Sequence, residues 1–133
     1  MNAGMRGPVG IDFMILLHGT TRRRAESIMQ NGPDPRFREP GGLATNDGFS
    51  TCVEGGPTPF GVPSDYAKGK AMQFPNEGGA AILTVDVPSD VIAFAVNEWF
   101  PLSQGLVQFD VGNGLEELLS AWPFLVKEIR DVT

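Results

Sequence analysis

The sequence predicts an α+β domain with a mixed, mostly antiparallel sheet and two or three short helices. Glycine and proline together make up 17 + 11 = 28 of the 133 residues, and they disfavour helix interiors by about 1 and 3 kcal/mol respectively. Such a chain is built of short elements joined by many turns. Segments with strand character outnumber those with helical character. The connections between them are too short for regular βαβ crossovers.

Length and composition indicate one domain. A chain of 133 residues has the usual size of a globular domain, and we expect a flexible N-terminal segment over residues 1–10 and a single domain over 11–133. The net charge of −6 provides no basic surface for phosphates, so we expect no nucleic-acid partner. A single cysteine, Cys52, excludes an internal disulfide and a cysteine-based zinc site, and with only one histidine we expect no metal. No apolar run approaches the ~20 residues of a membrane span, and residues 1–10 lack an apolar signal core. We therefore expect no membrane partner and a cytoplasmic location.

The first predicted elements are a strand over residues 11–17 and a helix that ends near residue 31. The strand is a near-continuous apolar run, typical of a strand buried on both faces, and a turn at 18–20 closes it. The helix has three apolar residues at i, i+3 and i+4, a threonine at 20 or 21 as its cap, and an Asn-Gly stop. Three arginines at 22–24 oppose the helix dipole. Either a solvated face or a nearby anionic ligand accounts for them.

The rest of the chain predicts further strands and two more helices. One helix runs from Ser64 to about Gln73 and follows a loop rich in glycine and proline. The other starts after Asn113 or Gly114, has four apolar residues at i, i+3, i+4 and i+7, and ends at Pro123. The predicted strands cover residues 49–53, 80–87, 91–96, 106–111 and 124–132.

The candidate functional residues begin with the only histidine and the only tyrosine of the chain. The sequence has no GxxxxGK[ST] loop, no GxGxxG turn and no GxSxG elbow. His18 follows the first strand and precedes Gly19, and a glycine at a strand end lets a ligand approach the backbone. The structural alternative is a histidine satisfied by backbone groups. Tyr66 lies in the first turn of its helix, where the alternative is a half-buried side chain with a solvated hydroxyl.

These residues occur in an order that resembles a known superfamily. A strand ends in Leu-His-Gly-Thr (17–20), a short helix ends at Gly32, a Gly-Phe-Ser-Thr strand (48–51) follows, and a later helix carries Tyr66. This order is similar to the His-Tyr-Glu branch of the ADP-ribosyltransferase superfamily, which includes diphtheria-toxin-like and poly(ADP-ribose) polymerase-like enzymes. The resemblance covers residues 11–87 and implies a split sheet, NAD as co-substrate and a protein or small-molecule acceptor.

The resemblance also implies a role for each matching residue. His18 hydrogen-bonds the adenosine ribose of NAD, Gly19 presents its backbone to the nicotinamide carboxamide, and Thr20 adds a side-chain contact. Tyr66 stacks on the nicotinamide ring, a cation–π contact. The pocket-lining residues from the neighbouring strand are Ser50 and Thr51. The arginines at 22–24 lie near the pyrophosphate in this hypothesis.

The residue that replaces the branch's glutamate stays open. Loss of nicotinamide has an oxocarbenium-like transition state, which needs a negative charge or an acceptor near the ribose. The strand best placed to supply the residue, 106–111, follows Gln104 rather than a glutamate. The nearest carboxylate along the chain is Glu98, and the further candidates are Asp110, Glu116 and Glu117. The helix dipole already accounts for the last two.

The leading prediction is an NAD-dependent mono-ADP-ribosyltransferase. The first alternative is a non-catalytic relative that binds NAD or ADP-ribose or acts as an interaction module. RNA 2′-phosphotransferases share the fold, but they need a basic RNA-binding surface that this chain lacks. A further alternative is an unrelated α+β domain, such as a carbohydrate-active enzyme with paired carboxylates, in which His18 is structural.

Overall fold

A five-stranded antiparallel sheet with helices on both faces forms the described part of the protein. The computed structural model covers residues 12–33, 48–54, 63–95 and 106–132 and confirms the α+β class. The strand order is β4-β2-β1-β3-β5, and every neighbouring pair is antiparallel. The strands are β1 (Phe13–Thr21), β2 (Gly48–Val53), β3 (Ala80–Pro88), β4 (Leu106–Asp110) and β5 (Lys127–Asp131). The helices are α1 (Arg22–Asn31), α2 (Pro63–Gln73), α3 (Ser89–Ile92), α4 (Leu115–Ala121) and a 3-10 turn (Trp122–Phe124).

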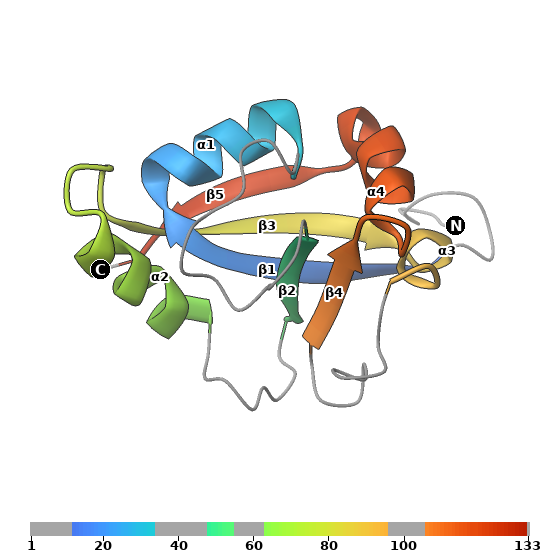
Figure 1. Ribbon diagram of the computed structural model, residues 1–133, viewed down its shortest axis with the longest axis horizontal. Helices are drawn as coiled ribbons and strands as arrows, with labels where there is room; N and C mark the ends of the chain where they lie inside the picture. The colour runs from blue at the N-terminus through green and yellow to red at the C-terminus, as the bar shows by residue number, and fades with distance from the viewer. Residues whose placement is uncertain (1–11, 34–47, 55–62, 96–105, 133) are drawn as a thin grey trace.

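The two faces of the sheet are covered by different helices. In Figure 1, α1 and α4 lie on one side of the sheet and α2 lies on the other. Successive side chains of a strand point to opposite faces, so each strand divides its residues between the two sides. We call the side that faces α1 and α4 the core face, and the side that faces α2 the α2 face.

The hydrophobic core lies on the core face. Apolar residues at alternate positions of the strands pack there against apolar residues of α1 and α4. Their side chains are removed from water, which stabilises the fold by about 25 cal/mol per Å² of apolar area. The largest fully buried apolar side chains are Phe109, Leu16, Leu83, Leu115, Leu118, Val87 and Val107.

Local signals set the limits of α1 as the sequence predicted. The hydroxyl of Thr21 accepts a hydrogen bond from the backbone N–H of Arg24 at 3.3 Å, which caps the first turn. Gly32 follows the last turn with φ +82°, and its N–H donates to the carbonyl of Ile28 at 2.7 Å. A residue without Cβ adopts this left-handed φ at little cost. Thr21 and Gly32 thus fix where the helix begins and ends.

Two predicted elements are wrong in detail. The turn predicted at residues 18–20 is part of β1, which continues to Thr21 because β3 pairs with it along its full length. The strand predicted at 91–96 is also wrong in its described part. There, Ser89–Ile92 forms a single helical turn, α3, and residues 93–95 continue in turns whose amides donate to carbonyls of the preceding residues. Local turn hydrogen bonds satisfy these backbone groups without a neighbouring strand.

Helix α2 packs directly on the backbone of β1 at Gly19. A Cβ added at Gly19 would lie 2.2 Å from the carbonyl oxygen of Pro63 and 3.0 Å from the amide nitrogen of Ala67. Both atoms belong to the backbone of α2, so no side-chain rotation can relieve the overlap. Only glycine lets the first turn of α2 approach the sheet this closely.

We therefore expect Gly19→Ala to lower the free energy of unfolding by about 1–3 kcal/mol, the usual effect of an overpacked site. Urea denaturation of the purified variant measures this loss. Gly69→Ala is the matched control, because Gly69 lies in the same helix and a Cβ there meets nothing within 4 Å. We expect the control to be neutral or stabilising by up to about 1 kcal/mol. Equal stability of the two variants would contradict the packing role of Gly19.

Candidate functional site

The sheet divides between β1 and β2. In the described part of the chain, β1 forms nine residue pairs with β3 and β2 forms five with β4, but β1 and β2 share only two, Leu16–Val53 and Leu17–Cys52. Beyond these pairs each strand continues with its outer partner alone. Figure 1 shows β2 and β4 running at a steep angle to β1 and β3. We call the region between residues 18–21 of β1 and 48–51 of β2 the fork.

The imidazole of His18 bridges the two sides of the fork. Its Nδ1 lies 2.8 Å from the carbonyl oxygen of Ser50. Its ring packs on that of Phe49, with 4.6 Å between the ring centroids. Because a carbonyl oxygen only accepts hydrogen bonds, Nδ1 carries the proton, and in the neutral ring Nε2 holds the lone pair. The side chain of His18 thus occupies the position at which a backbone amide of β1 would otherwise bond Ser50.

The backbone of Gly19 faces the fork. The amide of Glu54 donates to the carbonyl of Ile15 at 3.0 Å, so the backbone groups of Ile15 point toward β2. The amide of Arg22 donates to the carbonyl of Gly79 at 2.9 Å, so the even-numbered positions of β1 point toward β3. Backbone groups alternate along an antiparallel strand. The N–H and C=O of Gly19 therefore point toward β2, past the last β1–β2 pair.

A row of polar side chains borders the fork on the α2 face. Ser50 and Gln108 are directly paired residues of β2 and β4, and the hydroxyl of Ser50 donates to Oε1 of Gln108. Nε2 of Gln108 donates to Oδ1 of Asp110 at 2.7 Å. Because His18 holds the carbonyl of Ser50 and Gln108 holds its hydroxyl, Ser50 links the histidine to this row.

Tyr66 projects from α2 over the same face. Its hydroxyl is buried, and it has no hydrogen-bond partner among the described residues. Burial raises the pKa of Tyr66 to about 12, with a smaller contribution from Cys52. Cys52 is the β2 residue of the last β1–β2 pair, so the phenol lies beside the fork. A buried hydroxyl without a partner costs about 1–3 kcal/mol, and a ligand can supply the missing partner.

The structure brings some of the sequence-predicted residues together and separates others. His18, Gly19, Ser50 and Tyr66 all lie at the fork or beside it. Thr51 does not lie beside Ser50 as the sequence prediction required, since neighbouring strand residues point to opposite faces. Its hydroxyl is buried and donates to the carbonyl of Val107 at 3.0 Å. Thr20 is fully buried as well.

The candidates for the glutamate position are also separated. Asp110 lies in the polar row at the fork. The carboxylate of Glu116 accepts the N–H of Gly112, with both oxygens at 3.0 Å, which closes the turn before α4. Glu117 lies in the first turn of α4, where the helix dipole favours it. Gln104 and Glu98 lie outside the described residues.

Gln108 is the site residue that the sequence prediction missed. It is 8% exposed, while its neighbours Val107 and Phe109 are buried in the core. The period-2 pattern of Leu-Val-Gln-Phe-Asp contains this signal, because it places residues 108 and 110 on the face opposite two core residues. Its contact with Ser50 depends on the β2–β4 register, which the sequence alone does not reveal.

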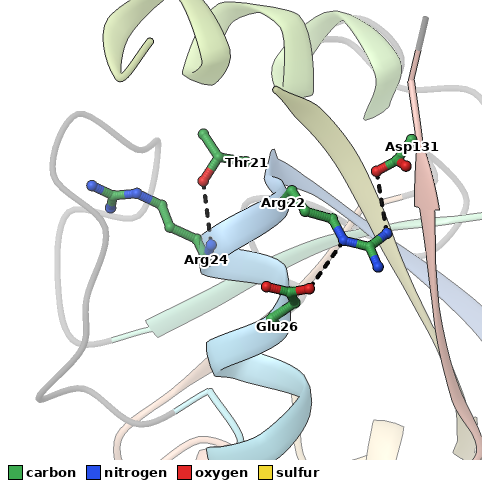
Figure 2. Close-up of polar contacts among 5 residues, drawn as sticks. All are labelled: Thr21, Arg22, Arg24, Glu26 and Asp131. Carbon is green, nitrogen blue, oxygen red and sulfur yellow. Dashed lines mark hydrogen bonds and ion pairs between the residues drawn. The ribbon is translucent and has the colours of Figure 1, made fainter. Parts of the chain in front are cut away.

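The arginines of α1 are paired with carboxylates of the chain. Figure 2 shows Arg22 between Glu26 and Asp131, each 3.2 Å from a guanidinium nitrogen. Arg24 lies 2.6 Å from Glu77 in a less exposed pair. These carboxylates offset the positive charge that opposes the helix dipole. Two of the three arginines are thus explained without an anionic ligand.

Two kinds of feature are absent from the residues that the structure describes. No group of three or more His, Cys, Asp and Glu side chains is arranged to hold a metal ion. None of the helices in the described ranges is long and apolar enough to cross a membrane. Comparison of the chain with protein-family models, curated proteins and solved structures found no match.

Removal of the Tyr66 hydroxyl tests whether it is unpartnered. We expect Tyr66→Phe to raise the free energy of unfolding of the ligand-free protein by about 1 kcal/mol, because it removes a buried polar group that has no partner. Thr51→Val is the control, since it deletes a buried hydroxyl that does have a partner and is expected to lose about 1 kcal/mol. Urea denaturation compares the two variants. Loss of stability in both would show that the phenol is hydrogen-bonded.

The Arg24–Glu77 pair predicts a defined acid dependence of stability. Hydrogen bonding by Arg24 lowers the pKa of Glu77 below its ordinary value, and burial opposes this shift. A depressed carboxyl pKa stabilises the fold above the unfolded-state value, and that contribution is lost as the pH falls through the folded-state pKa. Between about pH 6 and about pH 3, we expect wild type to lose more stability than Glu77→Gln.

Urea denaturation across this pH range measures the difference. Glu26→Gln is the matched control, because the Arg22–Glu26 pair is more exposed, at 38% and 58% against 20% and 16% for Arg24–Glu77. An exposed pair contributes little, so the control is expected to follow wild type. Parallel curves for wild type and Glu77→Gln would rule out the contribution.

Proposed function

We propose that this chain is an NAD-dependent mono-ADP-ribosyltransferase that transfers ADP-ribose to a protein or small-molecule acceptor and releases nicotinamide. The observation that carries the proposal is the fork, where His18 takes the carbonyl of Ser50 and the backbone of Gly19 faces the gap. A primary carboxamide has a donor and an acceptor side by side, which complement the N–H and C=O of a single residue. The nicotinamide carboxamide of NAD is such a group.

The other residues at the fork supply complementary chemistry. The lone pair on Nε2 of neutral His18 is suited to accept a hydrogen bond from a ribose hydroxyl. The buried phenol of Tyr66, held protonated by its raised pKa of about 12, is suited to donate to a ligand acceptor or to present its ring to nicotinamide. The site therefore offers a partner for the carboxamide, the ring and the ribose.

The proposed reaction breaks the bond between the nicotinamide nitrogen and C1′ of the ribose. The bonding electrons leave with nicotinamide, which departs as a neutral base, and positive charge develops on C1′ and the ring oxygen. An acceptor hydroxyl, amine or water then adds at C1′ and releases its proton. Polar groups fixed beside the ribose stabilise the charge that develops.

Binding of NAD without turnover is the second candidate function. The neutral amide of Gln108 in the polar row favours it, because an amide stabilises positive charge less than a carboxylate does. The two functions differ in one measurable product. A transferase or glycohydrolase releases nicotinamide, whereas a binding module returns NAD intact.

Calorimetric titration with NAD tests the proposal. We expect saturable binding to wild type and an affinity at least about tenfold lower for His18→Ala, which loses the ring at the ribose and its bridge across the fork. Glu128→Gln is the control, because Glu128 is exposed on β5 at the opposite edge of the sheet from β4, and we expect it to bind as wild type does.

Hydrogen exchange of the Gly19 amide adds an independent measure of the fork. Removal of the imidazole frees the carbonyl of Ser50, so in His18→Ala the β1–β2 ladder can extend by one pair and protect the amide of Gly19. Absence of NAD binding to folded wild type at millimolar concentration would refute the proposed function.

A further inference from the structure

The polar row beside the fork is held in one orientation. Because Oδ1 of Asp110 only accepts, the Gln108 atom 2.7 Å from it must be the amide nitrogen. The hydroxyl of Ser50 then donates to the amide oxygen, the other end of the same group. Two opposed hydrogen bonds therefore fix the amide of Gln108, a side chain that is only 8% exposed.

This arrangement leaves Gln108 with the chemistry of a hydroxyl-binding group. Its NH₂ has two hydrogens, and its contact with Asp110 uses one. Its carbonyl oxygen has two lone pairs, and its contact with Ser50 uses one. The remaining donor and acceptor suit a sugar hydroxyl, which both donates and accepts. Ser50 connects this amide to His18, so both groups can reach a single ligand at the fork.

Taking the proposed function as its basis, we infer that Gln108 contacts the ribose next to nicotinamide and that Asp110 is its positioning residue. The amide binds the ribose hydroxyls in the ground state, but it carries no negative charge to offset the positive charge that develops at C1′. The chain is therefore built for firm binding of NAD and slow release of nicotinamide.

The other described candidates are engaged elsewhere or lie on another element. Both oxygens of Glu116 accept the amide of Gly112, and Glu117 lies on α4. The carboxylate of Asp110 accepts from Gln108, so its charge acts on the amide first. Among the described residues, Gln108 is the side chain that touches the strand held by His18.

Exchange of the two functional groups tests the inference. The double variant Q108E/D110N moves the carboxylate from position 110 to position 108 with no change in net charge. The introduced carboxylate can still accept from Ser50, and the introduced amide can donate to it, so both hydrogen bonds of the row are retained. We expect nicotinamide release at least about tenfold faster than in wild type, with NAD affinity within a few-fold.

Three single variants separate a contact from a positioning role. We expect Gln108→Ala to lose at least about tenfold in NAD affinity, and Asp110→Ala to lose a comparable amount because the amide is no longer held. Asp110→Asn is the conservative control, since an amide oxygen accepts the same hydrogen bond, and it should keep wild-type affinity and turnover. Thermal unfolding of each variant confirms that it is folded, and chromatography measures nicotinamide.

The outcomes distinguish this inference from the proposed function. Wild type that fails to bind NAD would overturn both. Wild type that binds NAD, together with Gln108→Ala and Q108E/D110N that match it in affinity and nicotinamide release, would overturn only the role of Gln108. Loss of turnover in Asp110→Asn with unchanged affinity would assign the charge at C1′ to Asp110 and would also overturn it.

Discussion

The hydrogen bond from His18 to the carbonyl of Ser50 is the interaction on which the site depends. It replaces the next rung of the ladder between β1 and β2, so each strand continues only with its outer neighbour. A backbone rung and this bond satisfy the same carbonyl at similar energy. The imidazole, however, is wider than a backbone amide, and its packing on Phe49 holds the strands apart. One side chain thus converts a closed ladder into a binding position without leaving the carbonyl of Ser50 unsatisfied.

Gly19 carries a second constraint at the same place. On the α2 face, the carbonyl of Pro63 and the amide of Ala67 exclude a Cβ, while the glycine's own N–H and C=O point into the fork. The close packing of α2 fixes the height of Tyr66 above the sheet, because Tyr66 is the residue before Ala67. The residue that admits the helix is therefore also the residue that presents its backbone to a ligand. Any substitution there alters stability and binding together.

The sequence predicted what short-range rules determine. The limits of α1 depend on Thr21 and Gly32, which act within one turn of the helix, and the apolar runs of β3 and β4 identify strands from their own residues. Pairing between distant strands determines the rest. The β1–β3 ladder extends β1 through residues that read as a turn, and the β2–β4 register places Gln108 against Ser50. Both depend on residues more than 50 positions apart, so local patterns contain no signal for them.

The unfavourable features of the fold are concentrated at this one place. The phenol of Tyr66 is buried without a partner among the described residues, the β1–β2 ladder stops after two pairs, and Gln108 and Asp110 occupy a strand whose other residues form core. Each feature lowers stability by an amount that a simple change, such as phenylalanine, a longer ladder or a valine, would recover. Elsewhere the described chain follows local rules, with a capped helix, paired arginines and an apolar core. Local departures of this kind are expected where a ligand supplies the missing interactions, and all three border the same fork.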